Sequence, residues 1–475
     1  MVKSMTFEKL ERIFMKTVAF HTLGCKVNTY ETEAMQQLME AAGYRCVDFS
    51  EKADVYIINT CSVTNIADRK SRQMLHRARK MNEDAIVVAA GCYVESAKEK
   101  IDEDLSIDII VGNNNKNEIV NIINEYLQDK NENRFIIDIN KNTEYEEFNI
   151  SKINDHTRAF IKVQDGCNQF CSYCIIPFTR GRVRSRKMEN IIEEVKKLAS
   201  SGYKEVVLTG IHLSSYGVDF LDESYNKRME LLTQTEESDE EFVTKNELLN
   251  LIENIAKVDG IERIRIGSLE PRIIKEGFIK SLSEINKFCP HFHLSLQSGC
   301  DKTLKSMNRK YTASEFYEGV ELIRKYFDSP AITTDIIVGF PGESKEDFEE
   351  SKAFVEKVKF YETHIFPYSV REGTKAAHMP QVDGNEKAKR ANILNEINLA
   401  NQREFRSQRI TKVDEVLCEE TFTLDGKEYY TGYTKEYVKI AVLKDGLNTN
   451  DIIKGKIARF LTDDILLMEK EQNNV

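Results

Sequence analysis

The spacing of the cysteines constrains this chain more than any other feature. Among its ten cysteines, Cys167, Cys171 and Cys174 stand together in the pattern C-x3-C-x2-C. The chain has 475 residues, and no export signal is expected for it, so clustered thiols are expected to bind metal or react rather than form disulfides. Three thiolates fit three corners of a 4Fe-4S cluster and leave one iron for a small chelating molecule. A structural zinc site is less favoured, because no fourth Cys or His follows at ligand spacing.

Three further cysteines, Cys25, Cys61 and Cys92, lie far apart in the sequence. Around them, short apolar runs alternate with helix-period stretches, which predicts a parallel α/β sheet. Each cysteine follows a predicted strand, and the carboxyl ends of parallel strands share one edge of a sheet. We therefore expect these three thiols to converge on an iron–sulfur cluster; the alternative is three buried core thiols. The strands are expected at 16–23, 54–59, 85–90 and 107–112. We name Cys25, Cys61 and Cys92 the sheet set, and Cys167, Cys171 and Cys174 the loop set.

The middle of the chain predicts six more strand–helix units, which suggests a partial barrel two units short of a full (β/α)8 barrel. Polar residues collect near the expected strand ends, for example Ser268, Glu270 and Gln297. A polar stretch, 129–156, is expected to be a linker. The acidic stretch 219–247 is expected to be an inserted surface loop with a disordered core at 235–241. The six strands are expected at 159–163, 205–208, 263–266, 293–296, 332–338 and 364–366.

The C-terminal part predicts a charged helix over 385–409 and then a small β-barrel over 412–470, with turns at Asp425-Gly426 and Asp445-Gly446. The predicted fold class is therefore α/β, with three domains. They are an N-terminal parallel-sheet domain at 15–128, a central partial (β/α)6 barrel at 153–383 and a small β-barrel at 402–470.

Composition limits the possible partners. The formal net charge is −11, which argues against non-specific nucleic-acid binding by the whole surface but not against local basic patches. The stretch 69–80 carries six basic residues and no acid, and 180–187 carries five. The first is as readily a solvated helix face as a contact surface, whereas the second follows the loop set and is expected to face the substrate. No stretch is long and apolar enough to span a membrane, so a cytoplasmic protein is predicted.

The loop set and its neighbours resemble the radical S-adenosylmethionine motif, in which Tyr173 matches the aromatic residue beside the adenine. The sheet set, with Gly24-Cys25-Lys26-Val27-Asn28, resembles the auxiliary-cluster domain of the methylthiotransferases, and His21–Asn28 is most similar to the MtaB-type branch. Residues 412–470 resemble the TRAM domain, an RNA-binding module. Further matching stretches are Thr179-Arg180-Gly181-Arg182, Gly210-Ile211-His212-Leu213, Ser268-Leu269-Glu270-Pro271, Leu296-Gln297-Ser298-Gly299, Gly339-Phe340-Pro341-Gly342-Glu343, Phe366-Pro367-Tyr368-Ser369 and Arg371-Glu372-Gly373-Thr374.

The resemblance implies a tRNA methylthiotransferase, which converts N6-threonylcarbamoyladenosine at position 37 of tRNA to its 2-methylthio derivative by a radical mechanism. It implies two 4Fe-4S clusters, one on each cysteine set, and S-adenosylmethionine as cofactors. It implies no catalytic residue beyond the cluster ligands. The expected partners are the tRNA anticodon stem-loop and an electron donor such as flavodoxin or ferredoxin. The expected cofactor contacts are Tyr173, Ser268, Glu270, Gln297, Arg309 and Asp335, and the expected partners of the substrate carboxylate are Arg182 and Arg184.

Two alternatives stay open from the sequence. A sister methylthiotransferase would act on isopentenyl-adenosine in tRNA or on an aspartate of a ribosomal protein. A more remote alternative is a non-catalytic iron–sulfur electron carrier with an RNA-binding tail. Residues 1–14 precede the usual start of the family and are expected to be an extension of little consequence.

Overall fold

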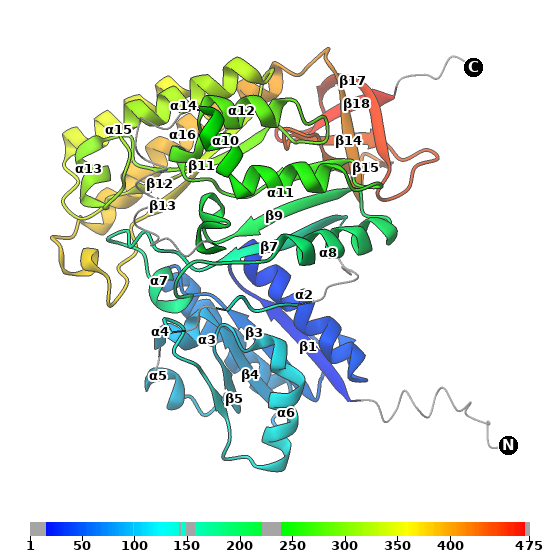
Figure 1. The fold of residues 1–475 in the computed structure, drawn as a ribbon, viewed down its shortest axis with the longest axis vertical. Helices are drawn as coiled ribbons and strands as arrows, with labels where there is room; N and C mark the ends of the chain where they lie inside the picture. The colour runs from blue at the N-terminus through cyan, green and yellow to red at the C-terminus, as the bar shows by residue number, and fades with distance from the viewer. Residues whose placement is uncertain (1–15, 98, 142–143, 149–156, 221–238, 471–475) are drawn as a thin grey trace. The chain divides into compact units, whose positions relative to one another are not determined.

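The computed structural model describes residues 16–97, 99–141, 144–148, 157–220 and 239–470 (Figure 1). The chain divides into two compact units, of which unit 1 comprises residues 1–150, 164–186 and 369–377. Unit 2 comprises residues 151–163, 187–368 and 378–475. The expected N-terminal extension, 1–14, lies outside the described residues.

Unit 1 is built on one parallel sheet. Its strand order is β2-β1-β3-β4-β5-β6, and every neighbouring pair is parallel. The four predicted strands are confirmed, and two short edge strands, β2 and β6, are added. The strands are β1 (Thr17–Thr22), β2 (Arg45–Val47), β3 (Val55–Thr60), β4 (Ile86–Gly91), β5 (Ile109–Val111) and β6 (Arg134–Phe135).

Helices cover both faces of this sheet, so its central strands are buried on both sides, as parallel strands require. Helices α2 (Lys26–Ala41) and α6 (Ile119–Gln128) pack on one face. Helices α3 (Asn65–Met81), α4 (Cys92–Ala97) and α5 (Glu99–Asp102) pack on the other. Strand β3 illustrates the result, because all six of its residues are buried.

The stretch expected to be a linker is partly folded into unit 1. It contributes β6 to the sheet, and Phe148 is buried with its ring 6.2 Å from that of Tyr30. The expectation is therefore wrong for these residues. Isolated anchors such as Phe148 give no periodic pattern, so the sequence shows a polar stretch where the chain in fact packs.

The six strands predicted for the middle of the chain are all present, and the second pairs with the third, the fourth with the fifth and the fifth with the sixth in parallel. Isolated parallel bridges join Ile264 to Phe288 and Leu269 to Leu294, which links the two small sheets of this region. A short strand, β8 (Arg184–Ser185), pairs antiparallel with the end of β7. The six strands are β7 (Arg158–Asp165), β9 (Glu205–Gly210), β10 (Arg263–Ile266), β11 (His291–Gln297), β12 (Ala331–Val338) and β13 (Glu362–Pro367).

Helices alternate with these strands, and two of them begin with capping boxes, at Thr312–Glu315 and Ser344–Asp347. The helices of unit 2 are α8 (Met188–Ser200), α10 (Asp239–Lys245), α11 (Glu247–Ala256), α12 (Glu276–Ser283), α13 (Asp301–Ser306), α14 (Ala313–Tyr326), α15 (Lys345–Val358) and α16 (Gly384–Ser407).

Helix α10 corrects one expectation about the acidic insertion. Residues 235–238 of its expected disordered core lie outside the described residues, but 239–241 belong to α10. Phe242 of this helix is 4% exposed, so one buried aromatic anchors a segment whose composition is otherwise acidic.

The C-terminal strands form a closed barrel in the order β14-β15-β16-β18-β17. Asp425 and Gly426 both have positive φ at the β14–β15 turn, as a tight hairpin requires. Arg263 of β10 donates to Glu415 at 3.0 Å and to the Tyr433 carbonyl at 2.8 Å, which fixes the barrel to its own unit. The predicted α/β fold class with a small C-terminal barrel is confirmed. The strands are β14 (Val413–Leu424), β15 (Lys427–Tyr433), β16 (Lys439–Leu443), β17 (Ile452–Phe460) and β18 (Leu466–Lys470).

Candidate functional site

The sheet set occupies one edge of the unit 1 sheet. Cys25 lies between β1 and α2, Cys61 directly follows β3, and Cys92 directly follows β4 and begins α4. Strands β1, β3 and β4 are consecutive neighbours in the sheet. Cysteines separated by one strand–helix unit each are therefore delivered to the same carboxyl edge.

The three thiols are close to one another. Gly24 has φ +109°, and a Cβ added there would lie 2.9 Å from the Cys61 Cβ and 3.0 Å from its Sγ. The loop carrying Cys25 thus packs directly on Cys61. Burial raises the pKa of Cys61 to about 12, and the neighbouring Cys92 and Cys25 act in the same direction. A metal bound here would have to displace the proton that burial holds on Cys61.

Amide side chains hold this edge together. Asn28 Nδ2 donates to the carbonyls of Leu23 (2.7 Å) and Thr60 (3.0 Å), so it joins the Cys25 loop to the end of β3. Asn59 Nδ2 donates to the Asn28 carbonyl at 3.0 Å, and Thr60 Oγ1 donates to the Ala90 carbonyl at 2.5 Å. The positions of all three loops are therefore fixed by hydrogen bonds between them.

The loop set lies on one tight loop after β7, and it also belongs to unit 1. Gly166 has φ +72°, and a Cβ there would overlap the Arg182 carbonyl. Cys167 N donates to the Gly181 carbonyl at 3.1 Å, and Cys174 N donates to the Cys171 carbonyl at 3.0 Å. The loop is closed by its own backbone, followed by the short helix α7 (Ile176–Thr179).

A third segment, 369–377, contacts the surroundings of both sets within unit 1. Arg371 donates to Ser62 Oγ at 2.9 Å, beside Cys61, and pairs with Asp68 at 2.8 Å. Ala376 N donates to the Ser172 carbonyl, inside the loop set, at 2.7 Å. Sequence reasoning did not assign Arg371 a role, although it stands in the stretch Arg371-Glu372-Gly373-Thr374.

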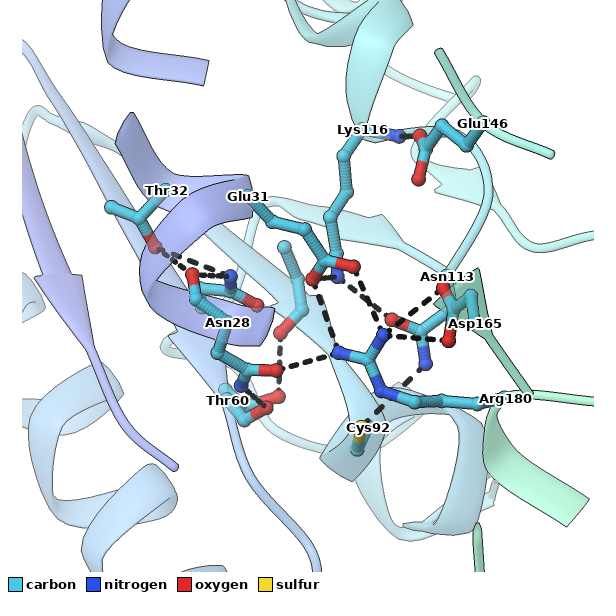
Figure 2. A network of polar contacts seen from close by, with 12 residues as sticks. Asn28, Glu31, Thr32, Thr60, Cys92, Asn113, Lys116, Glu146, Asp165 and Arg180 are labelled. Atoms are coloured by element: carbon cyan, nitrogen blue, oxygen red, sulfur yellow. Dashed lines mark hydrogen bonds and ion pairs between the residues drawn. The ribbon is translucent and has the colours of Figure 1, made fainter. Parts of the chain in front are cut away.

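A buried polar network surrounds Arg180, which is 0% exposed (Figure 2). Its guanidinium donates to Glu31 at 2.9 and 3.1 Å, to Asp165 at 3.1 and 3.2 Å and to Asn28 Oδ1 at 2.6 Å. Lys116, also fully buried, forms an ion pair with Glu31. Sequence reasoning missed this network, because a run of basic residues after a loop gives no sign that its partners lie about 150 positions away.

The chain matches known proteins along most of its length. Residues 17–112 match the family described as "Uncharacterized protein family UPF0004", and residues 161–355 match the radical SAM superfamily. The chain is 41% identical to "Threonylcarbamoyladenosine tRNA methylthiotransferase MtaB" of Bacillus subtilis, over 94% of this chain and 93% of that protein. It is 39% identical to the protein of the same name from Aquifex aeolicus, over 82% of this chain and 89% of that one. It belongs to the radical S-adenosylmethionine tRNA methylthiotransferase family.

A relative with a different substrate in its name also matches. The "tRNA-2-methylthio-N(6)-dimethylallyladenosine synthase" of Thermoanaerobacter sp. (strain X514) is 38% identical, over 85% of this chain and 83% of that protein. Membership of the methylthiotransferase family makes the chain an enzyme that uses 4Fe-4S clusters and S-adenosylmethionine. The site fits these groups, because unit 1 presents two separate sets of three cysteine sulfurs, the donor type that iron–sulfur clusters take.

Of the other four cysteines, three are core residues and one lies at the edge of the sheet. Cys289, Cys300 and Cys418 are 0% exposed, and burial raises the pKa of Cys289 and of Cys418 to about 11 each. Cys46 lies half-buried on the edge strand β2. These positions suit small apolar side chains rather than metal ligands.

The two basic stretches differ in exposure. On α3, the basic side chains of 69–80 mostly reach solvent. In 180–187, by contrast, Arg180, Arg184 and Arg186 are at most 1% exposed, which leaves Arg182 and Lys187 exposed. Arg184 lies 3.7 Å from Asp165, whereas Arg182 lies over the Phe170 ring at 4.5 Å.

The remaining expected contacts of this methylthiotransferase are polar groups at or near strand ends, apart from Tyr173, which is half-buried inside the loop set. Glu270, 6% exposed, pairs with Arg272 at 2.7 Å. Gln297 has φ +71° at the end of β11, and Arg309 Nη2 donates to the Ser295 carbonyl at 2.9 Å. Ser268 is exposed.

Asp335 belongs to a cluster with His293 and His364, two residues that the sequence did not single out. It lies 3.3 Å from His293 Nε2, and the His293 and His364 rings are 5.6 Å apart. The three residues stand on the neighbouring strands β11, β12 and β13. Asp335 and His364 are register partners.

Among the described residues, every helix is too short or too polar to cross a membrane.

Proposed function

We propose that this chain methylthiolates C2 of N6-threonylcarbamoyladenosine at position 37 of tRNA. The observation that carries the proposal is the presence, in unit 1, of two sets of three cysteines assembled in different ways. The relatives named for this reaction are matched over most of their length and support the choice of substrate. An electron carrier typically holds each 4Fe-4S cluster with four cysteines, whereas each set here supplies three.

In this proposal, Cys167, Cys171 and Cys174 hold the cluster that binds S-adenosylmethionine, and Cys25, Cys61 and Cys92 hold the auxiliary cluster. When bound, these groups supply the electron, the radical, the sulfur and the methyl group that an unactivated ring C–H bond requires. The protein's part is to fix the ligands, exclude water and orient the base. The hydrogen bonds of Asn28, Asn59 and Thr60 serve the first of these tasks.

We assign the cofactor contacts to Tyr173, Ser268, Glu270, Gln297, Arg309 and Asp335. Tyr173 offers an aromatic face beside the loop cysteines. The other residues belong to unit 2, and their carboxylates, amide, hydroxyl and guanidinium suit the ribose hydroxyls and the amino and carboxylate groups of S-adenosylmethionine. The proposed domains are 15–128, to which β6 and Phe148 add, 153–383 and 402–470, the last as a TRAM-like module.

The threonyl carboxylate of the substrate needs a cationic partner. Arg182 is exposed and is the first choice. Arg184, buried against Asp165, is proposed to support Arg182, because its Nη1 donates to the Arg182 carbonyl at 3.2 Å.

The tRNA would be bound through local basic surfaces, since the total charge is negative. The exposed basic side chains of α3 and the C-terminal barrel are the proposed contacts for the anticodon stem-loop. A flavodoxin- or ferredoxin-type donor is proposed to deliver electrons in the cytoplasm.

Mass spectrometry of tRNA nucleosides tests the function. In a strain that lacks this gene, the 2-methylthio form of threonylcarbamoyladenosine is expected to disappear while its precursor accumulates. Expression of the chain should restore it, and the Cys171→Ala and Cys61→Ala variants should not. Loss of the methylthio form of isopentenyl-adenosine instead would reassign the substrate to the sister branch.

A further inference from the structure

Arg180 follows the loop set in sequence, but its side chain is surrounded by residues of the parallel-sheet part of unit 1. The guanidinium is held by Glu31 and Asn28 of α2, as well as by Asp165 of its own segment (Figure 2). A fully buried arginine is costly unless it is paired. Pairing of Arg180 with Asp165 would be enough to close the loop. The additional contacts of Arg180 with α2 therefore need another reason.

Single amides connect Arg180 and its neighbour Thr179 to two of the sulfurs of the sheet set. Asn28 Oδ1, which accepts from Arg180 Nη2 at 2.6 Å, lies 3.9 Å from Cys25 Sγ. On the other side, Asn113 Nδ2 donates to the carbonyl of Thr179 at 2.7 Å and lies 3.7 Å from Cys92 Sγ. Arg180 and the residue before it are thus one side chain away from two of the three sulfurs.

The charge of Arg180 acts on the same sulfurs. Burial opposes this charge, but Cys92, Glu31 and Asp165 raise the pKa of Arg180 well above its ordinary value. Its Nε has no hydrogen-bond partner among the described residues. The sheet set therefore lies beside a buried arginine whose positive charge faces the carboxylates of Glu31 and Asp165 as well as the sulfurs.

We propose that Arg180 is a positioning residue for the auxiliary cluster, and that its buried charge raises the reduction potential of that cluster. The inference rests on the proposed function, because it assumes a cluster on Cys25, Cys61 and Cys92. One-electron reduction adds a negative charge to the cluster, and a nearby cation stabilises the reduced form more than the oxidised form. Glu31, which binds the same guanidinium, must act with the opposite sign.

The test isolates the auxiliary cluster in the full chain by replacing the loop set with Cys167→Ala, Cys171→Ala and Cys174→Ala. This parent is loaded with iron and sulfide without oxygen, and dithionite titration followed by electron paramagnetic resonance gives the midpoint potential. Arg180→Gln is expected to lower the reduced-to-oxidised ratio at a fixed potential about tenfold, or about 59 mV. Arg180→Lys should recover most of the difference, and Glu31→Gln should shift the ratio upward.

Arg186→Gln is the matched control. Arg186 is an equally buried arginine of the same segment, but it pairs with Glu147 at 2.8 Å and donates to the Phe148 carbonyl at 3.0 Å. Loss of the Arg186 guanidinium should lower the free energy of unfolding, because it also breaks buried polar contacts. It should leave the potential of the auxiliary cluster unchanged. Comparable shifts in Arg186→Gln and Arg180→Gln would show that the effect is general loosening, and would overturn the inference.

Two other outcomes also overturn it: an Arg180→Gln variant with the parent potential, or a Glu31→Gln shift in the same direction as that of Arg180→Gln. If Arg180→Gln holds no cluster, the inference is judged from the other two variants. A higher potential in Glu31→Gln and a potential near that of the parent in Arg180→Lys support it, and the opposite results overturn it. Absence of any cluster from the parent contradicts the proposed function instead, and it is seen before any Arg180 variant is compared.

Discussion

Unit 1 assembles two sets of three cysteines by different means. The sheet set comes from three loops that only the parallel sheet brings together, so its geometry is a property of the tertiary fold. The loop set lies within eight residues and is closed by backbone hydrogen bonds from Cys167 to Gly181 and from Cys174 to Cys171. One set should therefore fail when the sheet is disturbed, and the other only when its own loop is disturbed.

Removal of a ligand gives the largest expected effect. Cys61→Ala and Cys171→Ala should each lose one of the two clusters, about half of the bound iron, and all methylthiotransferase activity. Iron and sulfide analysis after anaerobic reconstitution measures this loss. Cys300→Ala is the control and should retain all of the iron, because Cys300 is a core thiol. Loss of iron from Cys300→Ala equal to that from Cys61→Ala would contradict the assignment.

Gly91→Ala should disturb the sheet set and leave the loop set intact. Gly91 has φ +94°, and an added Cβ would meet the Asn59 side chain and, at 2.8 Å, the Thr60 carbonyl. We expect a loss of about 2–4 kcal/mol in the free energy of unfolding and loss of iron from the sheet set only. Gly43→Ala, at φ +90° with open space around it, should cost about 1 kcal/mol and no iron. Thermal denaturation and iron analysis of both variants check this.

Gly166→Ala is the corresponding change for the loop set. An added Cβ would overlap the Arg182 carbonyl at φ +72°, so the backbone that closes the loop must shift. We expect the loop cluster to be lost while the sheet set keeps its iron, with a smaller fall in melting temperature than for Gly91→Ala. If both variants lost the same cluster, the two sets would not be independent in the way that their geometry indicates.

Much of this arrangement could be predicted from the sequence. The apolar runs predicted all four central strands of the unit 1 sheet, and strand adjacency predicted that Cys25, Cys61 and Cys92 would meet. The signal for such strands is a short, nearly continuous apolar run bounded by turn residues, because every residue of a strand such as β3 is buried. Edge strands β2 and β6 were missed, since two or three residues are too few to show a period.

The polar surroundings of the site could not be predicted in this way. Arg180 stands in a basic run that suggested a surface for the substrate, yet its partner Glu31 stands on α2, 149 positions away. Patterns of charge report only local neighbours, whereas a buried ion pair is a consequence of tertiary packing. Arg371 was missed for the same reason, because its partners Ser62 and Asp68 come from the loop after β3 and the start of α3.

Arg371→Gln should give the smallest of these effects and act on both sets. The change removes the ion pair to Asp68 and weakens the bond to Ser62, which costs about 1.5–3 kcal/mol for a charged hydrogen bond. Because Ala376 of the same segment holds the Ser172 carbonyl, loosening of the segment should speed the release of iron to a chelator a few-fold from each cluster. Lys375→Gln, an exposed change in this segment, should release iron at the rate of the unchanged chain. Release from the sheet set alone would show that 369–377 supports only that set, and the segment would then no longer count as a link between the two.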